Sequence, residues 1–187
     1  MKLIRSGPVQ KERPAVLLHD QTRIDVSQCT ADYDEAFFAH NGIARLEQWL
    51  RQHASSAPRL NSSERLGPPI SRPGKIICVG LNYRAHAAES KLALPGEPVL
   101  FSKATSSVAG ANDCVVMPRG GEKLDYEVEL AVVIGKKAAV SHANALSSML
   151  PATFWPMTIP SAAFNLSAGA SGSRARAATV LRLWVRS

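Results

Sequence analysis

The chain has 187 residues, 45% of them hydrophobic and 6% aromatic, so it is long enough to bury a core of its own. No apolar run approaches the ~18 residues of a spanning helix, and the first ten residues lack a signal-peptide pattern. These features argue against a membrane protein and a secretory signal. Three cysteines (Cys29, Cys78 and Cys114) stand far apart. Their spacing argues against a zinc site or a disulfide framework and predicts a cytoplasmic location.

The net charge of +7 is unevenly distributed along the chain. Up to Glu129 there are 16 Lys+Arg and 15 Asp+Glu, whereas the residues after it include six Lys+Arg and no acid. A nucleic-acid-binding function would rest on that basic tail alone, where aromatic and basic residues are not interleaved. We therefore expect no nucleic-acid partner, and a salt-dependent DNA-binding assay would test this.

The first 72 residues predict a small β-rich unit. The stretches LIR, AVLL and RIDV within residues 1–26 are short strands separated by turn residues, as in a meander. Residues 31–54 predict a helix, because apolar residues recur there at helical spacing. Residues 54–72 are rich in Ser, Pro and Arg and are typical of a connection.

The next segment predicts several strands and one helix. Residues 75–80 form an apolar run that ends in glycine, which predicts a buried strand and a tight turn. Asn82 can cap a short helix over residues 84–92. Three more strands are expected over residues 99–101, 115–117 and 124–134.

Two carboxylates in the string DYEVEL carry the strongest chemical signal. On a strand, Glu127 and Glu129 point the same way, and a hard divalent cation would relieve their mutual repulsion. The alternative is a solvated face. Beyond Glu129 both faces of the strand are apolar, which predicts that the strand enters the interior with its acids partly buried. A metal site is therefore the preferred interpretation.

His86 and Glu89 form the second candidate pair. The spacing i, i+3 on a helix places them on one face, where a carboxylate could orient the histidine to activate water. From the spacing alone, a solvent-facing surface pair is the favoured interpretation. Lys103 and Cys78 alone indicate little, and Cys78 is interpreted as a small core residue.

Three strings together resemble the fumarylacetoacetate hydrolase family. They are KIICVGLNYRAHAAES, EPVLFSKATSSVAG and MPRGGEKLDYEVELAVVIGKKA, and they occur in this order within residues 71–139. The resemblance implies a mainly β (α+β) fold, with a small N-terminal β domain followed by a mixed β roll or sandwich. It implies domains over residues 1–70 and 71–146.

The resemblance also implies a site. Glu127 and Glu129 would bind Mg²⁺ or Mn²⁺ with a third carboxylate further along, and His86 and Glu89 would activate water. Lys103 would line the pocket, and Asn82 and Tyr83 would contact substrate. The implied reaction is cleavage of a C–C bond in a small diketo or 2-oxo acid through a metal-held enolate. Ureidoglycolate lyase and hydroxymuconate isomerase or decarboxylase activities are alternatives, and intact relatives are implied to be homodimers.

The sequence departs from the family after about residue 146. Motifs like NDxSER and GGQWxKGKxxDxFxPLGP, which would supply the third carboxylate and a later lysine, are absent. Reading the codons from Ser147 two bases on permits both motifs, so we hypothesise a frameshift that sequencing the gene would test. Residues 147–187 are then expected to be a poorly packed, irregular basic tail. The resulting chain would be an inactive truncated fragment or an assembly module.

Overall fold

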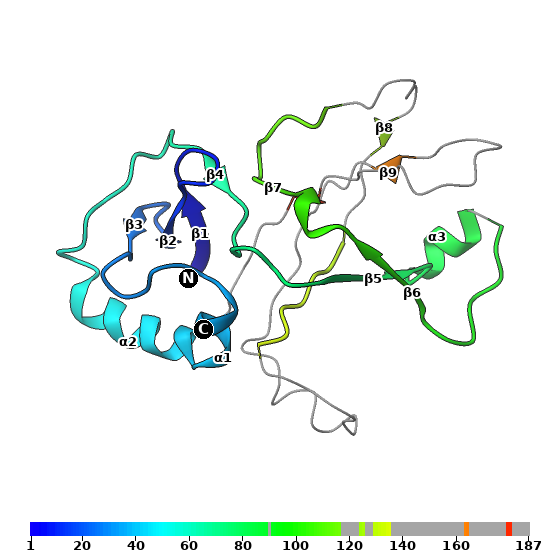
Figure 1. Cartoon of the computed structure of the whole chain (residues 1–187), viewed down its shortest axis with the longest axis horizontal. Helices are drawn as coiled ribbons and strands as arrows, with labels where there is room; N and C mark the ends of the chain where they lie inside the picture. The colour runs from blue at the N-terminus through cyan, green and yellow to red at the C-terminus, as the bar shows by residue number, and fades with distance from the viewer. Residues whose placement is uncertain (90, 117–123, 126–128, 136–162, 165–178, 181–187) are drawn as a thin grey trace.

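A computed structural model of the 187-residue chain describes residues 1–89, 91–116, 124–125, 129–135, 163–164 and 179–180. These residues form many short strands and few helices (Figure 1). The expected α+β, mainly β fold class is therefore confirmed. No helix in these ranges is long and apolar enough to cross a membrane.

The first sheet is an antiparallel meander to which a distant strand is added. Its strands are β1 (Lys2–Ser6), β2 (Arg13–Leu17), β3 (Arg23–Asp25) and β4 (Leu66–Gly67), in the order β3-β2-β1-β4. The three expected strands of residues 1–26 are confirmed. Strand β4 was not expected, because it lies in the segment that predicted only a connection.

The expected helix over residues 31–54 forms as two helices with a tight corner between them. They are α1 (Glu35–Ala39) and α2 (Gly42–His53). Asp34 caps α1 by accepting a hydrogen bond from the Phe37 backbone at 2.9 Å. A Cβ atom on Gly42 would overlap the ring and carbonyl of Phe37. The corner therefore requires glycine at this position.

One hydrophobic core joins the sheet to both helices (Figure 1). Leu3, Val16 and Ile24 pair in register across three strands, and their buried side chains pack with residues from α1 and α2. Tyr33 is fully buried in this core and donates its hydroxyl to the Ala15 carbonyl at 2.9 Å. Burial is the main cause that raises the pKa of Tyr33 well above its ordinary value, so this hydroxyl stays protonated and structural.

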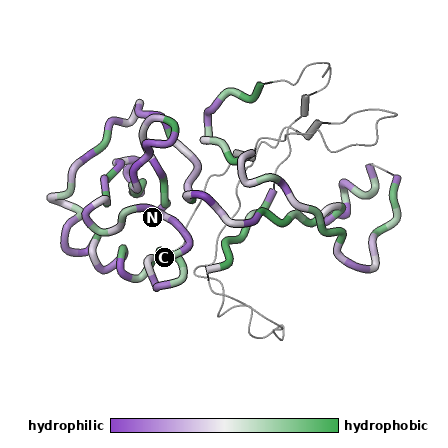
Figure 2. Tube along the Cα trace, in the orientation of Figure 1, coloured by the Kyte–Doolittle hydropathy of each residue, from purple (hydrophilic) through white to green (hydrophobic). Residues whose placement is uncertain are grey.

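The next three elements form an arm that extends away from the first sheet (Figure 1). We use "the arm" for β5 (Ile76–Gly80), α3 (Arg84–Glu89) and β6 (Val99–Lys103). The strands pair antiparallel, and the expected strands and helix in this region are confirmed. The arm carries much apolar sequence (Figure 2), but Ile77, Val79 and Leu100 are exposed. The expectation of a fully buried strand at residues 75–80 is therefore wrong.

The remaining described elements are short. They are the 3-10 helix η1 (Thr105–Ser107) and strands β7 (Val108–Ala109), β8 (Leu124–Asp125), β9 (Ala163–Phe164) and β10 (Thr179–Val180). Strand β10 pairs parallel with β7, and β9 pairs antiparallel with β8. Four residues of the expected irregular tail thus form paired strands. Most of that tail, residues 147–187, lies outside the described residues.

Two of the expected strands do not form as predicted. Residues 115 and 116 are not in a strand, and Met117 lies outside the described residues. In the described parts of the expected strand, residues 124–125 and 129–134, strand structure is limited to β8 and a single bridge at Glu129. Residues 130–135 have the apolar sequence that predicted a strand, but they pair with no strand in the described part of the chain. Alternating or continuous apolar sequence was therefore not sufficient to predict pairing.

A charged junction connects the first sheet to the loop after β7. Arg65 donates from Nε and Nη2 to both carboxylate oxygens of Asp113 at 2.6 Å, and from Nη1 to Glu12 at 2.8 Å. The Glu12 side chain is only 5% exposed and also lies 3.7 Å from Arg5. Asp113 in turn accepts from the Gly110 backbone at 2.7 Å. One guanidinium group therefore links residues 48 positions apart in sequence.

Candidate functional site

The pairing of β5 with β6 places Cys78 and Lys103 on one face of the arm. Ile76 is opposite Lys103, and Cys78 is opposite Phe101. Residues opposite each other in an antiparallel pair share a face, as do alternate residues along a strand. Cys78 and Lys103 are both half-buried, so the predicted pocket lysine lies on a partly covered surface.

Glu129 lies close enough to this face to act on Cys78 electrostatically. Burial raises the pKa of the Cys78 thiol, while the nearby Lys103 lowers it and Glu129 raises it. Two of the residues that the sequence predicted for the site, one cationic and one anionic, therefore act electrostatically on this thiol. The sequence predicted Cys78 as a core residue, whereas the register of β5 with β6 places it on the same face as Lys103.

Packing against the first core orients the segment that carries Glu129. Ala131 and Val133 contact the core of residues 1–70, and side-chain burial alternates along the segment. Glu129 is half-buried on the same side, whereas Leu130 and Ile134 on the other side are 54% and 60% exposed. The expectation that both faces of this segment are buried is therefore wrong. Only one face has a packing partner among the described residues.

The described residues supply one of the expected metal-binding carboxylates. The oxygen donors of Glu129 suit Mg²⁺ or Mn²⁺ in chemistry, but Glu127 lies outside the described residues. Within the described ranges, no three His, Cys, Asp or Glu side chains come together as a metal-binding group. The carboxylate oxygens of Glu129 suit a hard cation, but the described residues alone do not complete a binding site for one.

The expected water-activating pair lies on α3. His86, Glu89, Asn82 and Tyr83 are all exposed, and the buried side of this helix is Ala87. No hydrogen bond or ion pair joins His86 to Glu89 in the described structure. The helix face predicted from their spacing forms, but the interaction between them does not.

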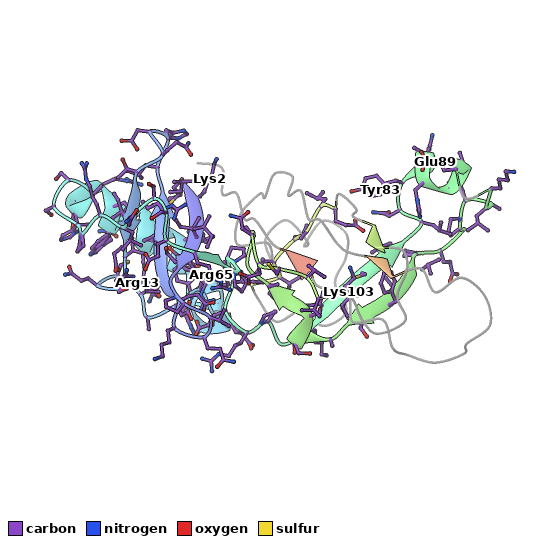
Figure 3. The ribbon with its side chains drawn as sticks, turned by 90° about the horizontal axis from the view of Figure 1, so that it is seen from above. Lys2, Arg13, Arg65, Tyr83, Glu89 and Lys103 are labelled. Carbon is purple, nitrogen blue, oxygen red and sulfur yellow. The ribbon has the colours of Figure 1, made fainter. Side chains whose placement is uncertain are left out.

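The α3 residues and Lys103 lie at opposite ends of the arm. Lys103 lies near the base of the arm, whereas Tyr83 and Glu89 lie at its outer end (Figure 3). The register agrees, since Lys103 is opposite Ile76 and α3 begins after Gly80. Four residues of strand correspond to about 13 Å. The catalytic assignment of His86 and Glu89 and the substrate-binding assignment of Asn82 and Tyr83 stay predictions.

Backbone strain at both ends of α3 was not visible in the sequence. Leu81 and Lys91 adopt positive φ angles of 52° and 54°, a conformation that costs non-glycine residues free energy. At the C-terminal end, Leu92 donates to the Ala87 carbonyl and Lys91 to the Ala88 carbonyl. This hydrogen-bond pattern is a Schellman motif. It ends the helix by residue 91, before the expected limit of residue 92.

Residues 75–149 match the sequence profile of the family described as "Fumarylacetoacetate (FAA) hydrolase C-terminal". A protein of Burkholderia multivorans named "Putative hydrolase" is 42% identical over 135 residues, covering 72% of this chain and 47% of that protein. A similarly named protein of Burkholderia lata is 41% identical with the same coverage. The chain therefore spans about half the length of the curated relatives it matches.

Solved structures show the same fold. The fumarylacetoacetate hydrolase from Exiguobacterium antarcticum aligns with a TM-score of 0.61 and 30% identity, covering 80% of this chain and 52% of that one. Maleylpyruvate hydrolase from Sphingobium sp. SYK-6, solved with manganese(II) and pyruvate, has a TM-score of 0.63, 22% identity and coverage of 80% and 55%. The second similarity shows the fold alone. Residues 75–149 are therefore similar in sequence to the C-terminal part of fumarylacetoacetate hydrolases, and the chain shares their fold.

Proposed function

We propose that this chain carries part of the site of a hydrolase or lyase that uses Mg²⁺ or Mn²⁺ to cleave a C–C bond in a small diketo or 2-oxo acid. The observation that carries the proposal is the family match over residues 75–149, because this segment includes the arm and Glu129. The manganese and pyruvate in the Sphingobium maleylpyruvate hydrolase structure are consistent with this class of cofactor and ligand.

The described residues supply two complementary charges to such a site. Lys103 is a half-buried cation on the arm, suited to the carboxylate of a substrate, and Glu129 is a half-buried oxygen donor. A divalent ion held by Glu127 and Glu129 would orient the two oxygens of the acid and stabilise negative charge on them. His86 would take a proton from water, with Glu89 as the carboxylate that orients it. For these roles, α3 must approach Lys103.

A metal titration and a cleavage assay test the proposal on the purified chain. Isothermal titration with Mg²⁺ and Mn²⁺ should show binding, and Glu129→Gln should weaken it by more than about tenfold. Glu97→Gln is the matched control, because Glu97 is an exposed acid on the connection between α3 and β6. Loss of the enol absorbance of acetylpyruvate should require the metal. Binding that is equal in wild type and Glu129→Gln would exclude Glu129 as a ligand.

The second candidate is a catalytically inactive fragment or assembly module. Large apolar side chains on the arm and after Glu129 are exposed in the described structure, including Leu100 and Ile134, and such surfaces favour association. This candidate predicts no tight divalent-metal site and no cleavage of acetylpyruvate. It predicts instead that the chain co-purifies with the longer Burkholderia multivorans relative when both are expressed together. Metal-dependent cleavage by the purified chain would exclude it.

A further inference from the structure

One face of the arm combines an apolar surface with a single cation at its end. We use "the Cys78 face" for the six residues that the strand register places on this side: Ile76, Cys78, Gly80, Val99, Phe101 and Lys103. The opposite face carries Ile77, Val79, Leu100 and Ser102, all of them exposed. On the Cys78 face the β5 residues and Lys103 are half-buried, so this face is the more sheltered of the two.

Lys103 supplies the cation of this face, and the carboxylate of Glu129 lies close enough to the same face to act on Cys78. Lys103 is half-buried and forms no ion pair within the described residues. A partly desolvated cation is stabilised by an anion. The residue pairs next to it, Cys78 with Phe101 and Gly80 with Val99, carry no charge. This distribution is complementary to a molecule with one anionic end and an apolar body.

Gly80 leaves space at the far end of the Cys78 face. A Cβ atom on Gly80 would lie 3.5 Å from Val99 Cγ1 and 3.6 Å from Phe101 Cε1. These are ordinary van der Waals distances, so a small apolar group fits there without strain. The side chains of Val99 and Phe101 are 46% and 48% exposed, and they have apolar surface left to cover. From Lys103 to Val99 the face is about 13 Å long.

We propose that the Cys78 face binds the body of the acid substrate, with its carboxylate at Lys103 and an apolar tail lying over Cys78 and Phe101 towards Gly80. This inference rests on the proposed function and narrows its substrate class to 2-oxo or diketo acids with an extended apolar tail. Cys78 and Lys103 lie on the same face of the strand pair, two residues apart in the register, so one small ligand can contact both. Cys78 and Phe101 then act as specificity-determining residues.

Cys78 is also a chemical reporter for occupancy of this face. The chain should be treated with iodoacetamide at constant pH, with pyruvate, 2-oxohexanoate or 2-oxodecanoate present, and with and without Mg²⁺. Alkylation of each cysteine is then read by peptide mass spectrometry. Bound acid should slow alkylation of Cys78 and leave the exposed Cys114 unchanged. The apparent affinity should rise about two- to fourfold for each methylene that is covered.

Variants separate the two ends of the ligand. Lys103→Gln should weaken protection by every acid, because it removes the cation. Gly80→Val should remove the stronger protection that long-tailed acids give and retain the protection by pyruvate. If Gly80→Val fails to fold, Phe101→Ala tests the same point, because it should reduce the stronger protection by long-tailed acids. Leu100→Gln is the matched control, since Leu100 is 64% exposed on the opposite face of the same strand. Far-UV circular dichroism confirms folding of each variant.

The outcomes distinguish this inference from the proposed function. Equal protection by pyruvate and 2-oxodecanoate would overturn the position of the tail, and full protection in Lys103→Gln would overturn the position of the carboxylate. Protection that rises with protein concentration alone would mean that a second copy of the chain covers the face, which would also overturn the inference. Metal-dependent cleavage of acetylpyruvate is measured separately and can succeed when each of these tests fails.

Discussion

Replacing Asp113 by Asn should weaken the connection between the first sheet and the loop after β7. Asp113 accepts two hydrogen bonds of 2.6 Å from Arg65 and one of 2.7 Å from the Gly110 backbone. The side chains of Arg65 and Asp113 are only 25% and 23% exposed, so solvent screens this pair less than a surface ion pair. Asp113→Asn removes the charge and keeps the shape.

The expected loss of stability follows from the number and type of bonds removed. Hydrogen bonds to charged groups contribute about 1.5–3 kcal/mol, and the amide oxygen of Asn can retain the bond to Gly110. We therefore expect Asp113→Asn to cost about 2 kcal/mol. Arg65→Met should cost more, about 3–5 kcal/mol, because it also leaves the buried Glu12 carboxylate with only Arg5, 3.7 Å away.

Urea denaturation followed by circular dichroism measures both values. The double variant should be less destabilised than the sum of the single variants, since they remove a shared interaction. Glu97→Gln is the control for loss of one negative charge at an exposed site. Equal stability of wild type and Asp113→Asn, or a smaller loss in Arg65→Met than in Asp113→Asn, would refute this account of the junction.

The same junction predicts part of the acid sensitivity of the chain. Hydrogen bonds from Arg65 are the main cause that lowers the pKa of Asp113 from its ordinary value of 3.8, and the Gly110 backbone adds to this. The stabilisation is therefore fully present above the pKa of the unfolded chain, about 4, and is lost as the pH falls below it. Asp113→Asn should show a smaller loss of stability in that range. An unchanged pH profile would contradict this.

Three further predictions concern single residues. Tyr33→Phe should lower stability by about 1–2 kcal/mol in a thermal melt, because a buried carbonyl on β2 loses its donor; no change would mean that another group replaces it. Lys91→Gly should stabilise the end of α3 by up to about 1 kcal/mol, since its φ is 54°, and faster amide exchange in α3 would contradict this. Gly42→Ala should cost more than about 2 kcal/mol because its Cβ overlaps Phe37, whereas Gly74→Ala, with no atom within 4 Å, should be neutral.

The part of the fold that the sequence predicted depends on local patterns. The meander, the helical region and the arm follow from alternation, from helical spacing and from turn residues close in the chain. Strand β4 was missed because its two residues pair with β1, some 60 positions earlier. Residues 130–134 were expected in a strand and do not form one, because strand formation depends on a partner that a single segment does not reveal.

The sequence predicted which residues belong to the candidate site, but it did not predict how they lie relative to one another. Family motifs identified Lys103 and Glu129, and both charges influence the pKa of Cys78. The face that Cys78 shares with Lys103 depends on the register of β5 with β6, which no local pattern fixes. The junction of Arg65 with Asp113 was missed for a related reason, since two charged residues 48 positions apart carry no pairing signal in sequence.

Because buried side chains are concentrated in residues 1–70, different parts of the chain should differ in how readily they unfold locally. All but one of the buried hydrophobic residues in the described structure lie between Leu3 and Leu46, and the exception is Ala87 in the arm. Backbone amides of β1 and β2 should therefore exchange with deuterium only through global unfolding. Amides of β5 and β6 should exchange through smaller, more frequent openings. Local fluctuation would then let a ligand reach a strand pair without disturbing the core that anchors it.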